Sequence, residues 1–382
     1  MDKKNKNPNV PNLRFNNDPY KKYNLYEFAT RVTRKNKDNV SNLPLTISAQ
    51  YGLVDQVSFF NKTVASKDMS GYYLLKNGEF AYNKSYSNDY PWGAIKRLDL
   101  YDMGCLSTLY ICFKTNDNIV NSNYLAHYFE SSKWHKQVAD IAGEGARNHG
   151  LLNIAVNDFF NTKHVVPTIE NQIKIAGFLD LIEKRIQTQI KIIDDYNSLK
   201  MGIYNWMFKE NYADYKLKQL AYIVKGDQIN NDQLLSNGPY YMMNGGTSPS
   251  GYLDSYNVSE NTISISEGGN SCGYVQFNSS PFWSGGHCYT IQNVNSALIE
   301  NKYLYHYLKH KEKEIMNLRI GTGLPNIQKK DLENFTIFVP NLLIQRKNLA
   351  LFEMLDEKIC ILNEELERLE MQKKYLLRNM FI

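Results

Sequence analysis

Amide, hydroxyl and cationic side chains gather in three stretches of the sequence, residues 82–87, 244–248 and 269–271. Amide groups can pair with adenine through two hydrogen bonds, and Arg or Lys can donate to guanine. Glycine in two of the stretches lets the backbone approach a groove closely. These residue types predict contacts with the edges of DNA bases, and ordinary hairpin loops are an equally good explanation of any single stretch.

The candidate DNA-contacting residues combine these stretches with basic and polar side chains elsewhere. They are Arg31, Arg34, Lys35, Gln50, Tyr82, Asn83, Lys84, Ser85, Tyr86, Ser87, Arg147, Asn244, Gly245, Thr247, Ser248, Asn270, Ser271, His287 and Arg319. The first forty residues hold ten Lys or Arg and four Asp or Glu, whereas the whole chain carries a formal charge of +5. A basic segment of this kind is typical of a phosphate-contacting surface. A solvated tail has the same composition, so charge alone does not decide.

Signals for catalysis and for metal binding are weak. The seven histidines do not form HxxH or HExxH, and the five cysteines are scattered and odd in number. No GxxxxGK[ST] loop is present. Residues 17–20 and 279–282 each lack one proline of the [DNS]PP[YFW] box of amino-methyltransferases, so turns explain them better. The sequence therefore predicts no metal site, no bound cofactor and no catalytic residue in this chain.

A long helix must follow the first group of candidate residues. Between residues 170 and 208 no proline occurs, and the apolar residues recur at steps of three, four or seven, which places them on one helix face. A helix of this length reaches about 58 Å. One apolar face on so long a helix requires a partner. The predicted seam on this helix consists of Leu179, Ile182, Ile186, Ile193, Tyr196 and Ile203.

The partner lies in the same chain, because the pattern returns 173 positions later. The second seam consists of Phe352, Leu355, Ile359, Leu366, Leu369 and Leu376. Pro167 and Pro340, Gln172 and Gln345, and Lys200 and Lys373 keep the same offset. Such internal self-similarity indicates a duplicated unit and predicts two long helices that form an antiparallel coiled coil.

The remaining segments predict two mixed α/β domains. Residues 44–48, 108–113 and 262–265 have the short apolar pattern of strands. Residues 121–142, capped by Ser122 or Asn123, and residues 300–318 are predicted to be helices. The expected order is domain 1–167, helix 168–208, domain 209–340 and helix 341–382.

With these features in place, the chain resembles the specificity subunits of type I restriction–modification systems. The opening Val10-Pro11-Asn12-Leu13-Arg14-Phe15 is similar to the usual start of that family. Residues 166–176, VPTIENQIKIA, resemble the entry to its conserved helices, and the second copy keeps only Val339-Pro340 and Gln345-Arg346. Residues 78–85 and 244–252 look like parts of two target recognition domains. The similarity covers essentially the whole chain.

The resemblance implies two target recognition domains that each read half of a bipartite double-stranded DNA target, with the helices as spacer. It also implies two modification subunits, which would supply S-adenosylmethionine and adenine-N6 transfer. The same resemblance allows two restriction subunits, with ATP and Mg²⁺, to complete the complex. This chain itself would be non-catalytic.

Two alternatives remain on the sequence alone. One is a non-catalytic adaptor with two interaction domains on a coiled coil that binds proteins rather than DNA. The other is a self-sufficient methyltransferase. No run approaches 18 apolar residues and the first residues lack an apolar signal core, so a soluble, cytoplasmic protein is expected.

Overall fold

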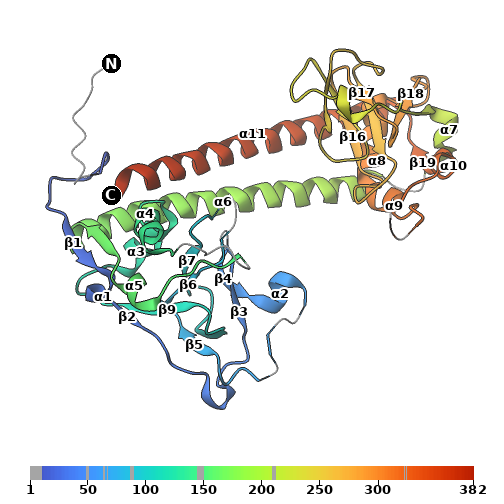
Figure 1. The fold of residues 1–382 in the computed structure, drawn as a ribbon. Coiled ribbons are helices and arrows are strands. Elements are labelled where there is room, and N and C mark those ends of the chain that lie inside the picture. The colour runs from blue at the N-terminus through green and yellow to red at the C-terminus, as the bar shows by residue number, and fades with distance from the viewer. Residues whose placement is uncertain are drawn as a thin grey trace. The chain divides into compact units, whose positions relative to one another are not determined.

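In the computed structural model (Figure 1), the described residues are 11–48, 51–62, 65, 66, 68–86, 90–143, 150–208, 212–321, 323 and 325–382. The chain divides into two compact units. Unit 1 is Met1–Thr188 together with Leu366–Ile382, and unit 2 is Gln189–Glu365. Each of the two long helices therefore contributes one part to each unit.

Unit 1 is built around an antiparallel four-stranded sheet of order β2-β9-β6-β7, with β1-β10, β3-β4 and β5-β8 as further pairs. Phe80 and Phe113 stack across β6 and β9 with 5.2 Å between ring centroids. The strands are β1 (Lys21–Asn24), β2 (Ala29–Arg31), β3 (Leu45–Ser48), β4 (Gly52–Asp55), β5 (Tyr73–Lys76), β6 (Phe80–Asn83), β7 (Ala94–Arg97), β8 (Met103–Leu106), β9 (Ile111–Thr115) and β10 (Lys163–Val166). The helices are α1 (Leu25–Phe28), α2 (Gln56–Phe60), α3 (Ser122–Glu130), α4 (His135–Ile141), α5 (Val156–Phe160) and the first part of α6 (Ile169–Met207).

Unit 2 repeats this plan with a four-stranded sheet of order β12-β18-β15-β16, beside the sheet β14-β13-β17 and the pair β11-β19. Ile263, Ile265 and Ile291 of its central strands are buried in one core. The strands are β11 (Ala213–Lys216), β12 (Tyr222–Lys225), β13 (Tyr240–Met243), β14 (Gly251–Leu253), β15 (Thr262–Ser266), β16 (Val275–Asn278), β17 (Trp283–Ser284), β18 (Cys288–Gln292) and β19 (Thr336–Val339). The helices are α7 (Leu217–Leu220), α8 (Asn301–His310), α9 (Glu312–Met316), α10 (Lys329–Glu333) and the first part of α11 (Leu342–Met380).

The repeat seen in the sequence reappears in the element bounds. Helices α6 and α11 each contain 39 residues and begin 173 positions apart, as do α5 and α10, and β10 and β19. The register of the central strands also corresponds, because Phe80 pairs with Phe113 as Ile263 pairs with Ile291. One duplicated α/β unit therefore accounts for both halves of the chain, and the predicted mixed α/β class is confirmed.

Within each unit, α6 and α11 lie side by side and antiparallel (Figure 1). In unit 1 Lys373 of α11 pairs with Glu183 of α6, and in unit 2 Lys200 of α6 pairs with Asp356 of α11. Glu183 and Asp356 occupy equivalent positions of the two copies, as do Lys200 and Lys373. The same ion pair therefore occurs twice with the roles of the copies exchanged, which fixes the helix register in both units.

The predicted seam residues of both helices are buried or half-buried. In unit 2 the side chain of Gln189 is also buried and donates from Nε2 to the carbonyl of Leu362 at 2.8 Å. Tyr204 packs against Phe352 with 4.7 Å between ring centroids. The predicted heptad positions missed Gln189, Leu362 and Tyr204.

A buried glutamine near the start of each long helix ties it to the adjoining domain. Gln172 accepts from the backbone N–H of Asn121 at 2.7 Å and donates to the carbonyls of Ile119 and Pro167. In unit 2 the equivalent Gln345 accepts from the N–H of Glu300 at 2.8 Å and donates to the carbonyls of Leu298 and Pro340. Both side chains are fully buried. Each amide therefore satisfies three backbone groups that water does not reach.

Two predicted helices are interrupted in the structure. The helix expected over 121–142 is divided into α3 and α4, and its cap is Asn121, whose Oδ1 accepts from the N–H of Tyr124 at 3.0 Å. Ser131 and Trp134 end α3 by donating to the carbonyls of Tyr128 and Phe129. The helix expected over 300–318 is likewise divided into α8 and α9 at Lys311. At the end of α3, these side-chain hydrogen bonds to backbone carbonyls take the place of a further helical turn. Apolar periodicity in the sequence does not predict such bonds.

The strand expected over residues 108–113 begins later, at Ile111, and continues to Thr115. The N–H of Tyr110 donates to the carbonyl of Ser107 at 3.2 Å, which forms a turn ahead of the strand. Among the helices of the described residues, none combines the length and the apolar content that a membrane crossing requires.

Replacing Gln345 by leucine should lower the free energy of unfolding. The leucine has a similar volume but leaves the three backbone partners of Gln345 without a hydrogen bond, and each buried unsatisfied group costs about 1–3 kcal/mol. Gln372→Leu, at an exposed position of α11, should change it by less than about 0.5 kcal/mol. Urea denaturation of the purified chain measures both, and equal effects would contradict the proposed role of Gln345.

Two buried histidines should make the protein sensitive to acid. Burial lowers the pKa of His164 and of His306 to about 4, from an ordinary value of 6.5. The unfolded chain therefore binds protons that the native chain excludes, and stability is lost as pH falls from about 6.5 to about 4. The loss is on the order of 3 kcal/mol for each histidine.

Urea titrations at several pH values between 4 and 8 measure this slope. The double variant His164→Gln/His306→Gln should flatten it, even if its stability at pH 8 is lower. His287→Gln, at a side chain that is 60% exposed, should leave the slope unchanged. A double variant with the wild-type slope would show that other groups cause the acid sensitivity.

Candidate nucleic-acid interface

Four loops of unit 2 meet at the ends of β12, β13, β15 and β18. The Oδ1 atom of Asn244 accepts from the backbone N–H of His287 at 3.0 Å, and the N–H of Glu267 donates to the carbonyl of His287 at 2.9 Å. A Cβ atom on Gly226 would lie 2.3 Å from the carbonyl oxygen of Ser284. Glycine is therefore required for the close packing of the β12 and β17 ends. We call this arrangement the four-loop site: residues 225–227, 244–248, 267–271 and 285–287.

The carboxylate of Glu267 lies at the centre of the four-loop site. Its Oε1 atom accepts from Lys225 Nζ at 2.6 Å and from the hydroxyl of Tyr289 at 3.0 Å. Its Oε2 atom is buried and has no hydrogen-bond partner among the described residues, and His287 Nδ1 lies 3.6 Å from it. Burial, together with the Glu267 carboxylate, raises the pKa of Tyr289 well above its ordinary value, so the phenol stays a donor.

The structure brings together many of the residues predicted for the second domain. Asn244, Gly245 and His287 are in mutual contact, because a Cβ on Gly245 would lie 3.2 Å from the Cβ of His287. Thr247, Ser248 and Asn270 are exposed on the same loops, and Ser271 is half-buried. Arg319 lies near Cys272, close enough for its positive charge to act on the Cys272 thiol.

In unit 1, Arg31, Arg34 and Lys35 gather around Tyr73 and Glu79. Arg34 pairs with the buried carboxylate of Glu79 at 2.7 Å. Arg31 lies 3.4 Å from the Tyr73 hydroxyl, and the Lys35 ammonium lies over the Tyr73 ring, 4.5 Å from its centroid. All three basic side chains are exposed and lie close together, so they form a positively charged part of the surface of unit 1.

A second group in unit 1 follows β6, at residues 83–86. The Oδ1 atom of Asn83 accepts from the N–H of Ser85 at 3.0 Å, and the carbonyl of Lys84 accepts from the N–H of Leu152 at 2.9 Å. Ser85 and Tyr86 are exposed. In the strand register, Lys84 occupies the position of Glu267 in unit 2, since β6 corresponds to β15. Both copies therefore place polar loops at the same end of their central strand.

Tyr82 was predicted to contact DNA, and the structure contradicts this prediction. Its side chain is fully buried, stacks on Phe159 with 5.0 Å between ring centroids, and donates to the carbonyl of Trp92 at 2.8 Å. As an inward-facing residue of β6 it belongs to the core of unit 1, because alternate residues of a strand face opposite sides. The predicted residues Gln50, Ser87 and Arg147 lie outside the described residues.

Sequence reasoning missed Lys225, Glu267 and Tyr289. Glu267 precedes two glycines and an asparagine, a pattern that predicted only a turn. Glu267 contacts Lys225 and Tyr289 because β12 and β15 both pair with β18. These three strands are far apart in the sequence. The sequence places Glu267 directly after the strand residues Thr262–Ser266 and before Gly268, and this position gives no sign that the side chain is buried.

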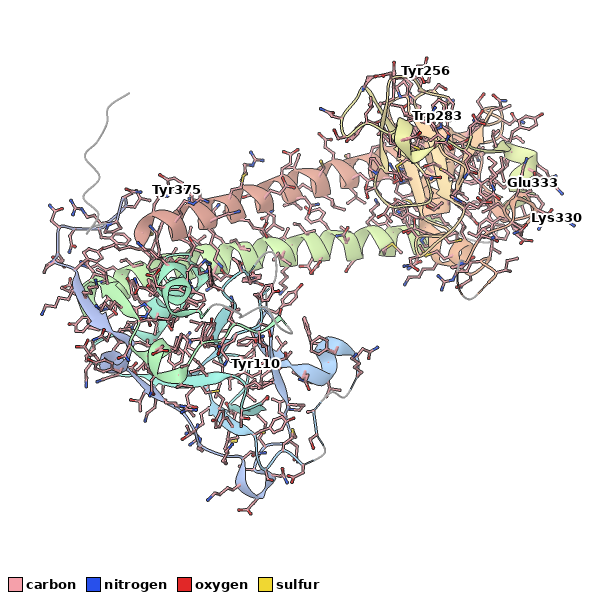
Figure 2. All side chains as sticks on the ribbon, in the orientation of Figure 1. Tyr110, Tyr256, Trp283, Lys330, Glu333 and Tyr375 are labelled. Atoms are coloured by element: carbon pink, nitrogen blue, oxygen red, sulfur yellow. The ribbon has the colours of Figure 1, made fainter. Side chains whose placement is uncertain are left out.

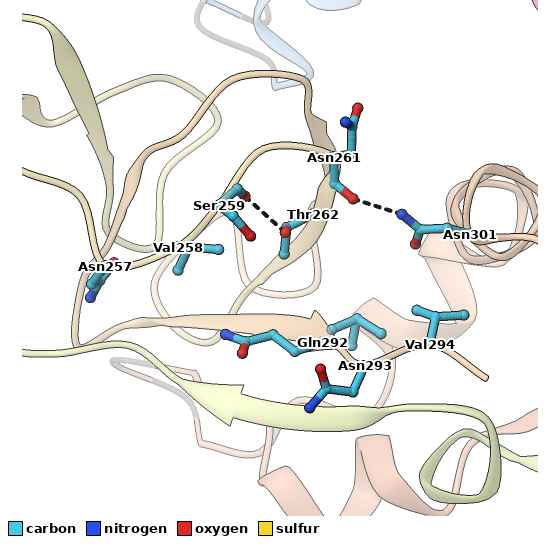
Figure 3. A pocket seen from close by; sticks show the side chains of 10 residues that line it. Asn257, Val258, Ser259, Asn261, Thr262, Gln292, Asn293, Val294 and Asn301 are labelled. Carbon is cyan, nitrogen blue, oxygen red and sulfur yellow. Dashed lines mark hydrogen bonds between the residues drawn. The ribbon is translucent and has the colours of Figure 1, made fainter. Parts of the chain in front are cut away.

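A separate groove of about 370 Å³ lies at the opposite ends of β15 and β18, next to the start of α8 (Figure 3). Asn301 donates from Nδ2 to the carbonyl of Asn261 at 2.6 Å, and its Oδ1 atom is buried without a hydrogen-bond partner among the described residues. The described residues that line the groove carry no charge. Its amide side chains are Asn257, Asn261, Gln292, Asn293 and Asn301.

Within the described part of the chain, no cluster of three or more His, Cys, Asp or Glu side chains could hold a metal ion. Burial raises the pKa of Cys112 to about 12 and that of Cys288 to about 11. These thiols are therefore protonated core residues. The geometry thus offers hydrogen-bond donors and acceptors for recognition.

Comparison with known proteins shows what this chain is similar to. Residues 209–371 match the family described as the type I restriction modification DNA specificity domain. The segment contains the four-loop site and most of α11. The similarity to type I specificity subunits that the sequence indicated is confirmed.

The relatives match part of the chain. A protein of Mycoplasma pneumoniae named as a type I specificity subunit is 33% identical over 158 residues, which are 41% of this chain and 42% of that protein. A protein of Mycoplasma genitalium with the same kind of name is 32% identical over 127 residues, 33% of each chain. The matched segments therefore span less than half the length of these relatives.

Solved structures match the fold over nearly the whole chain. The type I restriction–modification S subunit of M. genitalium has a TM-score of 0.62 and 17% identity, and the match covers 98% of this chain and 99% of that one. A chain from a structure of a type I restriction–modification system has a TM-score of 0.59 and covers 96% and 99% at 17% identity. At such identity the similarity concerns the fold.

The close packing of the four-loop site predicts that Gly226→Ala destabilises unit 2. The new methyl group would meet backbone oxygens rather than flexible side-chain ends, so strands must move apart at a cost of about 1–3 kcal/mol. Gly268→Ala is the matched control, because its Cβ would lie 3.6 Å from the nearest atom. Urea denaturation compares the two, and equal stabilities would show that the loops adapt freely.

Proposed function

We propose that this chain is the DNA specificity subunit of a type I restriction–modification complex, with one half of a bipartite target read by each unit. The observation that carries the proposal is the duplication. An α/β domain with a polar loop at the same end of its central strand occurs twice, and each copy is followed by a 39-residue helix. The DNA specificity family covers the second copy, and the internal repeat extends the argument to the first.

The long helices suit a spacer between two readers. A 39-residue helix is about 58 Å long, which corresponds to about 17 base-pair steps of 3.4 Å. This length is an upper bound on the separation of the half-sites. Contacts with phosphates would come from the exposed cations Arg31, Arg34 and Lys35, whereas the polar loops after β6 and β15 would read bases.

Exposed apolar residues on the long helices support docking of partner subunits. Leu181 of α6 is 64% exposed and Met354 at the equivalent position of α11 is 61% exposed. Large apolar side chains at repeated exposed positions are typical of a protein interface. We propose that each copy docks one modification subunit. S-adenosylmethionine and adenine-N6 transfer would belong to those subunits, and ATP-dependent cleavage to restriction subunits that join the complex.

The experiment uses the host strain from which this gene has been removed. The strain is complemented with the wild-type chain, with Leu181→Glu/Met354→Glu, or with Leu100→Glu, a control at a residue that is 62% exposed outside the long helices. Genome-wide mapping of methylated adenine should show a bipartite motif with the wild type and the control. The double variant should abolish the methylation, because the charges oppose docking.

Methylation that persists without the gene would contradict the proposal and would favour an adaptor that binds proteins. The purified chain alone is expected to transfer no methyl group from S-adenosylmethionine to DNA. Transfer by the chain alone would instead identify a self-sufficient methyltransferase.

A further inference from the structure

One buried carboxylate in the four-loop site lies beneath two exposed side chains, those of Lys225 and His287. The Glu267 side chain is 11% exposed, whereas those of Lys225 and His287 are 51% and 60% exposed. Lys225 Nζ lies 2.6 Å from Oε1, and His287 Nδ1 lies 3.6 Å from Oε2. The Tyr289 hydroxyl donates to the same Oε1 atom. The carboxylate is therefore held by Tyr289 on the core side and by Lys225 on the solvent side.

The charges in this cluster largely cancel. Phosphate contacts depend on uncompensated positive charge, which releases counterions from DNA. Here the negative charge of Glu267 offsets that of Lys225, so long-range attraction to phosphate is weak. The hydrogen-bond donors of Lys225 nevertheless stay available to a ligand. Lys225 has further N–H donors, and the exposed His287 ring places polar nitrogen atoms beside them.

Three glycines lie in the loops of the site. Gly245, Gly246 and Gly268 are half-buried and carry no side chain, and Gly245 packs against His287 and Gly268. The exposed Thr247 and Ser248 follow directly and can make polar contacts. In Figure 2, the labelled Trp283 marks the strand from which the loop to His287 departs.

We propose that Glu267 is a positioning residue that holds Lys225, beside His287, as a hydrogen-bond donor to the major-groove edge of a guanine. This inference rests on the proposed DNA-reading function and names one base in the half-site of unit 2. Guanine is the base that presents two acceptors, O6 and N7, in the major groove, and a lysine ammonium can donate to both. Adenine and cytosine present an amino group to the same edge, and a lysine ammonium cannot accept a hydrogen bond from it.

The test is a methylome of the gene-deleted host strain complemented with Glu267→Gln, Lys225→Ala or His287→Ala. Each variant should lower the preference for guanine at one position of one half-site by about 5- to 150-fold. The other half-site should be unchanged. The exchange of unit 2 between two related chains assigns the affected half-site to this unit.

Glu333→Gln and Lys330→Ala on α10 make the same charge changes outside the site and should leave the motif intact (Figure 2). Since Glu267→Gln could weaken folding, His287→Ala serves as the second variant, because its side chain is exposed. Copurification with the modification subunit and thermal melting establish that each variant is folded and assembled.

A uniform loss of methylation at all sites, without a change in base preference, would overturn the proposal in favour of a phosphate contact. An unchanged motif in all three variants would overturn it as well. Failure of the proposed function is a different result, because then the wild-type chain restores no motif in the deletion strain.

Discussion

The apolar seam shared by α6 and α11 is the constraint on which both units depend. Each helix has 39 residues and one apolar face, which is unfavourable in water unless it is covered. In unit 1 the start of α6 is covered by the end of α11, and in unit 2 the end of α6 is covered by the start of α11. Neither domain therefore has a complete core without both copies of the helix. The exchanged pairs Glu183–Lys373 and Lys200–Asp356 select one register among those that the seam allows.

The duplicated glutamines connect that seam to the sheets. Gln172 and Gln345 each fasten the start of a long helix to the segment that precedes α3 or α8. A buried amide that makes three hydrogen bonds is orientation-specific, since each donor and acceptor has one partner. Displacement of the helix would leave several buried groups unsatisfied. The start of each long helix is consequently held in one orientation against the domain that precedes it.

Both copies place a buried carboxylate beneath exposed basic side chains. In unit 1 Glu79 pairs with Arg34, and in unit 2 Glu267 lies beneath Lys225 and His287. The four-stranded sheets of the two units correspond in strand order. Loops at strand ends lie at the surface, so their side chains can differ between the copies without disturbing the sheet.

The sequence by itself determined the duplication, the two helices and the mixed α/β class, because periodicity and repeats are local properties of the chain. It also indicated Asn244, Gly245 and His287, which the fold brings into contact. Only the tertiary structure decided that Tyr82 is a core residue, that α3 ends at Glu130, and that Glu267 meets Lys225 and Tyr289. Those outcomes depend on strand pairing between distant segments and on side chains that compete for backbone groups, and neither is written in the spacing of residue types.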